Sequence, residues 1–350
     1  MEVQYPEARF TYIDGAIGGT GSDLGVFRLQ RDCLVYKPDL VFLDFSANDD
    51  IYADGPEKLA TYESLVRRIL VEGNCPLVQV IFPFKWNSKS GTADDMKGRI
   101  AHLRIAKAYN AAVGDAILHI QNLVAKDQSL VNEIWNIDGV HPGDFGYQLF
   151  ADAAWQGFAA AVKSGTSCRV PEKMLHADTY MTWSRNRISQ MKSLPKGWQP
   201  GLVNRISAWY DAYMPRWLDD VVIAKNMTTG GDNQTKKESK TIHEVEPLIV
   251  KFKATSVLVF GEKTLVSGKH MALIDGKKAT WEHRGKVSTE FDLSSKRFGG
   301  NTHHYSMLMK GLDPNKVHTL EIRPLFSTKE KQEIRLESIC LAGGEAKLIE

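Results

Sequence analysis

The sequence predicts an α/β domain built on a three-layer, doubly wound parallel sheet, followed by an all-β sandwich. Two observations predict this order. In the first half, short apolar runs alternate with segments of helical periodicity, and the connections are short, which is typical of a parallel sheet covered by helices on both faces. After Pro247, short runs rich in Val, Ile, Leu and Thr follow one another closely, which is typical of a β-sandwich.

The alternation in the first half can be followed element by element. Residues 38–45 and 77–82 have the continuous apolar pattern of strands buried on both faces, and residues 10–14 form a further strand-like run. Helical spacing of apolar residues is present at 24–35, 57–72, 94–112 and 145–162. Residues 116–120 fit either a short strand or the start of another helix.

The second half divides into two parts. A Trp-rich connecting segment, helical or irregular, is expected at 165–245, between an α/β domain at 1–164 and a jelly-roll-like β-sandwich at 246–350. Within the connecting segment, 204–218 has the pattern of an amphipathic helix, and the polar run 228–237 that of a flexible surface loop. The strands expected in the sandwich are 248–253, 256–260, 270–274, 280–283, 318–323 and 333–341, with Asp275-Gly276 as a hairpin turn.

Composition excludes few classes of protein. The chain of 350 residues is 43% hydrophobic and 25% charged, which is ordinary for a soluble globular protein. A net charge of +2 gives no reason to expect nucleic acid or an anionic membrane as a partner. No apolar run is long enough for a transmembrane helix, and no signal peptide is visible at the start. Compartment and oligomeric state are left open by the sequence.

Polar and glycine residues gather where the predicted strands end. Gly18-Gly19 follows the first strand-like run, Asn48 follows 38–45, and Asp138 and His141 precede the helix at 145–162. In open α/β sheets, ligands bind at the carboxyl ends of the strands. A histidine can accept a proton near neutral pH, and an aspartate can hold its ring in one tautomer. Glycine N–H groups and an asparagine amide suit an oxyanion, each donor being worth about 3–4 kcal/mol of barrier. Only a nucleophile is missing.

Other chemistries fit these residues less well. The glycine loop does not follow the G-x-G-x-x-G spacing of dinucleotide sites. Asn48-Asp49-Asp50 could suggest a hard cation, but no further carboxylate is placed by spacing to complete a site. His283, His303 and His304 lack zinc-like spacing and are expected at the surface or in packing. The sequence therefore predicts no metal and no organic cofactor.

Three stretches together resemble the SGNH (GDSL-type) hydrolase family. They are Ile17-Gly18-Gly19-Thr20-Gly21-Ser22, then Pro38-Asp39-Leu40-Val41 leading into Ala47-Asn48-Asp49, then Asp138-Gly139-Val140-His141-Pro142. These match the second, third and fifth sequence blocks of the family, in order, and Ser46 stands where the third block usually has glycine. The resemblance covers residues 1 to about 163.

The resemblance implies a flavodoxin-like sheet and serine-type hydrolysis of a carboxylic ester. It assigns Gly19 and Asn48 as oxyanion donors, His141 as the base and Asp138 as its orienting acid, and it places Gly18 and Asp49 beside them as substrate-binding residues. Bacterial two-domain members with a β-sandwich, many of them carbohydrate deacetylases, are the expected relatives. Removal of acetyl or another small acyl group from a saccharide is the activity that this implies.

The nucleophile block of the family is not found. The family's serine lies in a Gly-Asp-Ser or Gly-Gly-Ser turn after the first strand, but Met1–Ile17 contains no serine. We therefore expect the sheet to lack that strand as well. The chain could be a partial gene product, or a pseudo-enzyme that only binds carbohydrate. Alternatively, Ser22 or Ser46 could replace the nucleophile, although Ser22 also suits a helix cap.

Overall fold

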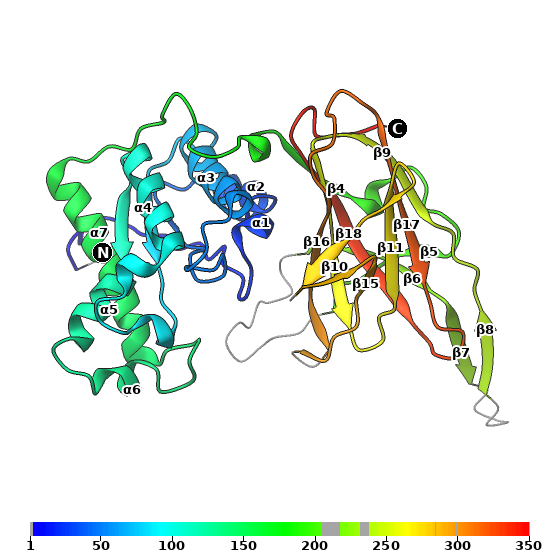
Figure 1. Ribbon diagram of the computed structural model, residues 1–350, viewed down its shortest axis with the longest axis horizontal. Helices are drawn as coiled ribbons and strands as arrows, with labels where there is room; N and C mark the ends of the chain where they lie inside the picture. The colour runs from blue at the N-terminus through cyan, green and yellow to red at the C-terminus, as the bar shows by residue number, and fades with distance from the viewer. Residues whose placement is uncertain (1–2, 205–217, 232–237, 284, 298–299, 350) are drawn as a thin grey trace. The chain divides into compact units, whose positions relative to one another are not determined.

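The computed structural model describes residues 3–204, 218–231, 238–283, 285–297 and 300–349. The chain divides into two compact units, Met1–Leu175 and His176–Glu350 (Figure 1). None of the helices in these described ranges is both long and apolar enough to span a bilayer.

The first unit is built on a parallel sheet. Its strands are β1 (Val41–Leu43), β2 (Leu77–Ile81) and β3 (Ala112–Asp115), in the order β1-β2-β3. Every residue of β2 is buried, as expected of a central strand between two parallel neighbours. Strands are thus confirmed within 38–45 and 77–82, but Phe42 of β1 is 44% exposed, so β1 is not buried on both faces as expected.

Helices cover this sheet in two groups. One group is α3 (Pro56–Val71) and α4 (Lys97–Tyr109), which contact each other; the other is α5 (Ala116–Val124), α6 (Leu130–Ile134) and α7 (Asp144–Ser164), which also contact each other. Both groups contact the sheet, so the unit has the predicted three layers. The helix predicted at 24–35 is instead divided into α1 (Ser22–Gly25), α2 (Leu29–Asp32) and η1 (Leu34–Tyr36). Two further 3₁₀ turns are η2 (Lys85–Asn87) and η3 (Ala93–Asp95).

The strand predicted at residues 10–14 is wrong. Phe10, Tyr12 and Ile13 have no strand assignment and are exposed by 40%, 85% and 45%. A strand needs a neighbour for its backbone N–H and C=O groups. Among the described strands, β1 pairs only with β2, so residues 10–14 find no partner in this sheet. Their apolar side chains consequently remain in solvent.

The helix that follows the Asp138–His141 loop lies directly against the sheet. A Cβ on Gly157 of α7 would overlap the carbonyl oxygen of Val113, and a Cβ on Gly114 of β3 would lie 2.6 Å from the Cα of Ala154. Real Cβ contacts are not this short, and both obstacles are backbone atoms. Glycine at these two positions therefore sets the distance between α7 and β3.

Replacement of Gly157 by alanine is expected to lower the free energy of unfolding by about 1–3 kcal/mol, because overpacking outweighs the gain in helix propensity. Urea denaturation followed by circular dichroism measures the change. Ala160→Gly, at an exposed position of α7, reports the propensity effect alone, at about 0.5–1 kcal/mol. A Gly157→Ala variant that is more stable than the parent would contradict the close contact.

The second unit contains two antiparallel sheets of six strands each. The first has the order β16-β10-β18-β6-β5, with β4 also paired to β18; the second has the order β12-β11-β17-β9-β19, with β15 also paired to β11. The strands of the first are β4 (Trp183–Arg187), β5 (Trp198–Gly201), β6 (Val221–Lys225), β10 (Ser256–Thr264), β16 (Asn301–Met309) and β18 (Glu333–Ala342). Those of the second are β9 (Leu248–Lys253), β11 (Lys269–Ile274), β12 (Lys277–Lys278), β15 (Glu290–Asp292), β17 (His318–Leu325) and β19 (Lys347–Ile349).

One apolar core joins the two sheets, as expected of a β-sandwich. It includes Val259 and Leu336 from the first sheet and Phe252 and Ile322 from the second. Each of the six predicted strands overlaps an observed one, and β9 has the predicted limits. The turn Asp275-Gly276, with φ of 51° and 77°, joins Ile274 to Lys277 as predicted. The smaller ribbon β13 (Trp281–His283) and β14 (Lys286–Ser288) completes this region.

The expected domain limits differ from the observed division. The predicted connecting segment, 165–245, supplies β4, β5 and β6 to the first sheet, and the two units divide after Leu175. Its strands are short, and β4 reads Trp-Ser-Arg-Asn-Arg, so their sequence carries little apolar alternation. In the predicted loop 228–237, residues up to 231 belong instead to β7 (Met227–Gly231), which pairs with β8 (Glu238–Ile242). The helix predicted at 204–218 lies almost entirely outside the described residues.

Candidate active site

Asp138 and His141 form a hydrogen-bonded pair on the loop before α7. The distance from His141 Nδ1 to Asp138 Oδ2 is 2.9 Å, and Asp138 Oδ1 accepts the backbone N–H groups of Val140 and His141 at 2.6 Å each. The hydrogen bond to the His141 side chain, followed by the one to its backbone, lowers the pKa of Asp138 to about 2. Asp138 is thus an ionised acceptor that fixes both the loop and the imidazole, as the sequence predicted.

This pair is accessible. The side chain of His141 is 25% exposed and that of Asp138 42%. With Nδ1 bonded to a carboxylate, Nε2 is the ring nitrogen that would exchange a proton with a nucleophile. The arrangement can therefore perform general base chemistry on a ligand that approaches from solvent.

The glycine loop is held next to the loop that follows β1. Gly19 has φ of 72°, a left-handed conformation that glycine adopts without strain, and Thr20 Oγ1 donates to the carbonyl of Ile17 at 2.8 Å. The backbone N–H of Ser22 donates to Asp49 Oδ1 at 2.9 Å. The predicted oxyanion donors Gly19 and Asn48 are both exposed, and their role stays a prediction.

Asp49 is buried and makes contacts within the protein, and its predicted role in binding substrate stays a prediction. It was expected to bind substrate, but it is only 7% exposed, and besides Ser22 it contacts Lys58 Nζ at 3.3 Å. Burial raises the pKa of its carboxyl, while Lys58 and Ser22 partly offset this effect. These contacts make Asp49 a positioning residue that ties the glycine loop to the Asn48 loop. Gly18, the other residue predicted to bind substrate, is half-buried beside the exposed Gly19.

The two serines considered as substitute nucleophiles are both buried and hydrogen-bonded. Ser46 Oγ donates to Asp44 Oδ1 at 2.5 Å and accepts the N–H of Phe82 at 2.9 Å. Ser22 Oγ pairs with Thr61 Oγ1 at 2.6 Å. The exposed fractions of Ser46 and Ser22 are 1% and 0%. Neither hydroxyl faces an incoming ester, so the structure gives no support to substitution by either.

Hydrogen bonds connect all the predicted site loops in one series. Ser22 reaches Asp49, Ser46 on the same loop reaches Phe82 at the end of β2, and the N–H of Lys85 donates to the carbonyl of Gly139 at 2.9 Å. The three sequence blocks, far apart in the chain, therefore meet at the carboxyl edge of the sheet. Sequence analysis missed the segment 82–88 that completes the series, although its place directly after a buried strand was a signal for it.

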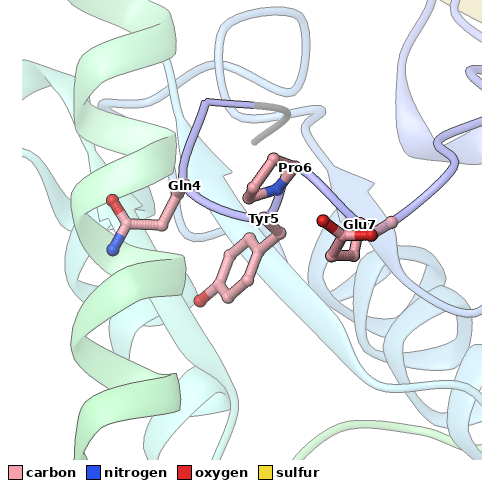
Figure 2. A pocket seen from close by; sticks show the side chains of 5 residues that line it. Gln4, Tyr5, Pro6 and Glu7 are labelled. Carbon is pink, nitrogen blue, oxygen red and sulfur yellow. The ribbon is translucent and has the colours of Figure 1, made fainter.

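A surface hollow lies elsewhere on the same unit. It has a volume of about 450 Å³ and is lined by the consecutive residues Gln4–Ala8 (Figure 2). None of the predicted site residues lines it. Among the described residues, no group of three or more His, Cys, Asp and Glu side chains is placed to hold a metal ion.

Comparisons with known proteins identify one family model and several structures that resemble this chain. Residues 4–149 match the model of the GDSL-like lipase/acylhydrolase family. A two-domain esterase (CEX) active on acetylated mannans, co-crystallised with mannopentaose, superposes with a TM-score of 0.72 at 21% identity, covering 99% of this chain and 83% of that one. A second structure of a two-domain esterase (CEX) active on acetylated mannans gives a TM-score of 0.70 at 22% identity, covering 99% and 84%. A search of curated proteins finds no match.

The first unit has an α/β fold and carries the hydrogen-bonded Asp138–His141 pair. Residues 4–149 resemble the GDSL-like lipase/acylhydrolase family, and this resemblance supports a carboxylic ester hydrolase. The similarity to the two-domain esterases shows that the whole chain shares their fold, with a β-sandwich behind the hydrolase domain.

Proposed function

We propose that this chain carries the base and the oxyanion donors of a serine-type esterase that removes acetyl groups from a carbohydrate. The observation that carries the proposal is the 2.9 Å contact between His141 Nδ1 and an ionised Asp138, on the loop where the family has its acid and base. No residue is assigned here as the nucleophilic serine of the family, because Met1–Ile17 contains no serine and Ser22 and Ser46 are buried.

The proposed reaction uses these residues in two half-reactions. His141 Nε2 takes the proton of the serine hydroxyl as its oxygen attacks the ester carbonyl, and Asp138 stabilises the imidazolium. The Gly19 N–H and the Asn48 amide donate to the oxyanion. On collapse, the sugar hydroxyl leaves with the proton from His141. Water then attacks the acyl-serine with the same base, and acetate is released.

The substrate class is inferred from the structural relatives. Both superposed structures are esterases active on acetylated mannans, and one holds mannopentaose. An acetylated mannan-type oligosaccharide is therefore the substrate that we propose for this chain.

A second candidate function is a carbohydrate-binding protein without catalysis. The bonded and buried state of Ser22 and Ser46 favours it for the 350-residue chain, because serine-type hydrolysis needs an accessible serine. The two candidates make different predictions for a chain extended upstream, and the same experiment separates them.

Hydrolysis of p-nitrophenyl acetate by the 350-residue chain, by a version extended upstream, and by both with His141→Ala tests the proposal. We expect no turnover by the short chain and turnover by the extended one that falls at least about 10⁴-fold in His141→Ala. Ester hydrolysis of equal rate in parent and His141→Ala would contradict the role of His141. If the extended protein is folded but does not hydrolyse p-nitrophenyl acetate, the carbohydrate-binding function would be favoured.

A further inference from the structure

An exposed tryptophan stands on a firmly bonded turn beside the Asp138–His141 pair. Trp86 lies in η2 with 55% of its surface exposed, whereas the next residue, Asn87, is 1% exposed. Asn87 Oδ1 accepts the N–H of Phe84 at 2.7 Å, and its carbonyl accepts Gln121 Nε2 at 2.7 Å. These bonds fix the backbone on which the Trp86 ring is presented to solvent.

Contacts place this ring against the loop of His141. The position of a Cβ on Gly139 would lie 3.5 Å from Trp86 Cζ3, which is ordinary van der Waals distance. The hydrogen bond from Lys85 N–H to the Gly139 carbonyl joins the same two loops. Behind the ring, Phe84 packs at 4.7 Å between ring centroids, with planes inclined at 38°. Phe84 therefore packs against the Trp86 ring. The same ring lies beside Gly139, which is two residues before His141 in the sequence.

A second exposed ring lies on the other predicted site loop. Tyr52 is 44% exposed, and its hydroxyl accepts Asn87 Nδ2 at 3.0 Å. It follows Asn48 closely in the sequence. The buried amide of Asn87 thus holds Tyr52 next to the turn that presents Trp86, so exposed aromatic side chains stand on the Asn48 loop and on the turn that contacts the His141 loop.

We propose that Trp86 is the saccharide platform of this site, on which a sugar ring of an acetylated oligosaccharide stacks while its acyl group reaches His141. The inference rests on the proposed function and adds the residue that selects a saccharide ester. A tryptophan presents a large, flat apolar ring, and a pyranose presents an apolar C–H face that can stack on it. Rigid aromatic side chains with polar groups beside them, here the Tyr52 hydroxyl, are typical of small-ligand sites.

Binding can be tested without hydrolysis. Unacetylated mannopentaose and xylopentaose are titrated calorimetrically into the 350-residue chain and its Trp86→Ala, Trp86→Phe and Tyr36→Ala variants. We expect Trp86→Ala to weaken binding at least about tenfold, because tryptophans dominate such contacts, and Trp86→Phe to weaken it less than about threefold. Tyr36, 56% exposed before the amino end of β1, is the matched control and is expected to change nothing.

This experiment distinguishes failure of the Trp86 proposal from failure of the proposed esterase activity. Parent affinity in Trp86→Ala, or no binding of either pentasaccharide by the parent, would overturn the platform whatever the result with p-nitrophenyl acetate. In an active extended protein, Trp86→Ala is expected to raise KM for an acetylated oligosaccharide about tenfold and to leave KM for p-nitrophenyl acetate unchanged. Binding that depends on Trp86 without any hydrolysis would sustain the platform and contradict the esterase.

Discussion

In a protein that carries the missing serine, Asp138→Asn is expected to lower kcat about 10⁴-fold, with little change in KM. The carboxylate accepts from His141 Nδ1 and stabilises the imidazolium that forms in the transition state, whereas an amide in its place favours the wrong tautomer. Steady-state hydrolysis of p-nitrophenyl acetate measures the loss.

The pH dependence of this loss follows from the pKa of Asp138. Since that pKa is lowered to about 2, the carboxylate stays ionised at every pH above about 4, and the acid limb of the parent's rate profile belongs to another group. At pH values above the acid limbs of both proteins, the ratio of parent to variant kcat is therefore expected to be constant. Asp144→Asn, an exposed acid in the first turn of α7, is the control and should retain nearly full activity. Equal loss in both variants would point to a disturbed loop instead of a lost orienting acid.

The parts of the fold that the sequence predicted are those in which each segment carries its own pattern. The strand β2 is apolar throughout and buried on both faces, and β9 alternates buried and exposed residues along its whole length. The Asp138–His141 pair was predictable for the same reason, because three residues on one loop bring the acid and base together.

What the sequence could not predict depends on partners far along the chain. Residues 10–13 have the composition of a strand but pair with none of the described strands, and they remain exposed. The polar segment of β4 becomes a strand beside β18, where Arg185 pairs with the buried Glu337 at 2.9 Å. Asp49 was assigned to substrate because it follows Asn48, yet its partner is Ser22, 27 residues earlier. Such contacts leave no periodic signal.

Two histidines in the core of the β-sandwich are expected to make the second unit sensitive to acid. His270 of β11 and His304 of β16 join the two sheets, with 3.4 Å between their Nε2 atoms, and are 0% and 2% exposed. Burial lowers the pKa of His270 to about 3 and that of His304 well below its usual value. For His304, the nearby charges of His270, Lys263 and His303 act in the same direction.

The sign of the effect follows from these lowered pKa values. In the unfolded chain both imidazoles take up a proton below about pH 6.5, but the folded core does not, so stability is complete above that pH and is lost as the pH falls. Between pH 7.5 and 5, each neutral buried histidine should lower the free energy of unfolding by about 2 kcal/mol, or about 4 kcal/mol for the pair. The raised pKa of Glu337 acts in the opposite direction in the same unit.

The double variant His270→Phe/His304→Phe isolates this contribution. His270 already stacks on Phe291 at 4.9 Å with ring planes inclined by 7°, so a phenyl ring can take its place in the core. Urea denaturation of parent and variant at pH 7.5 and pH 5 gives four free energies, and their double difference removes Glu337 and every other shared group. We expect the parent to lose about 4 kcal/mol more than the variant on acidification. An equal loss of stability in both proteins would mean that the two imidazoles already take up protons inside the folded sandwich. The prediction that the buried pair stays neutral would then be wrong.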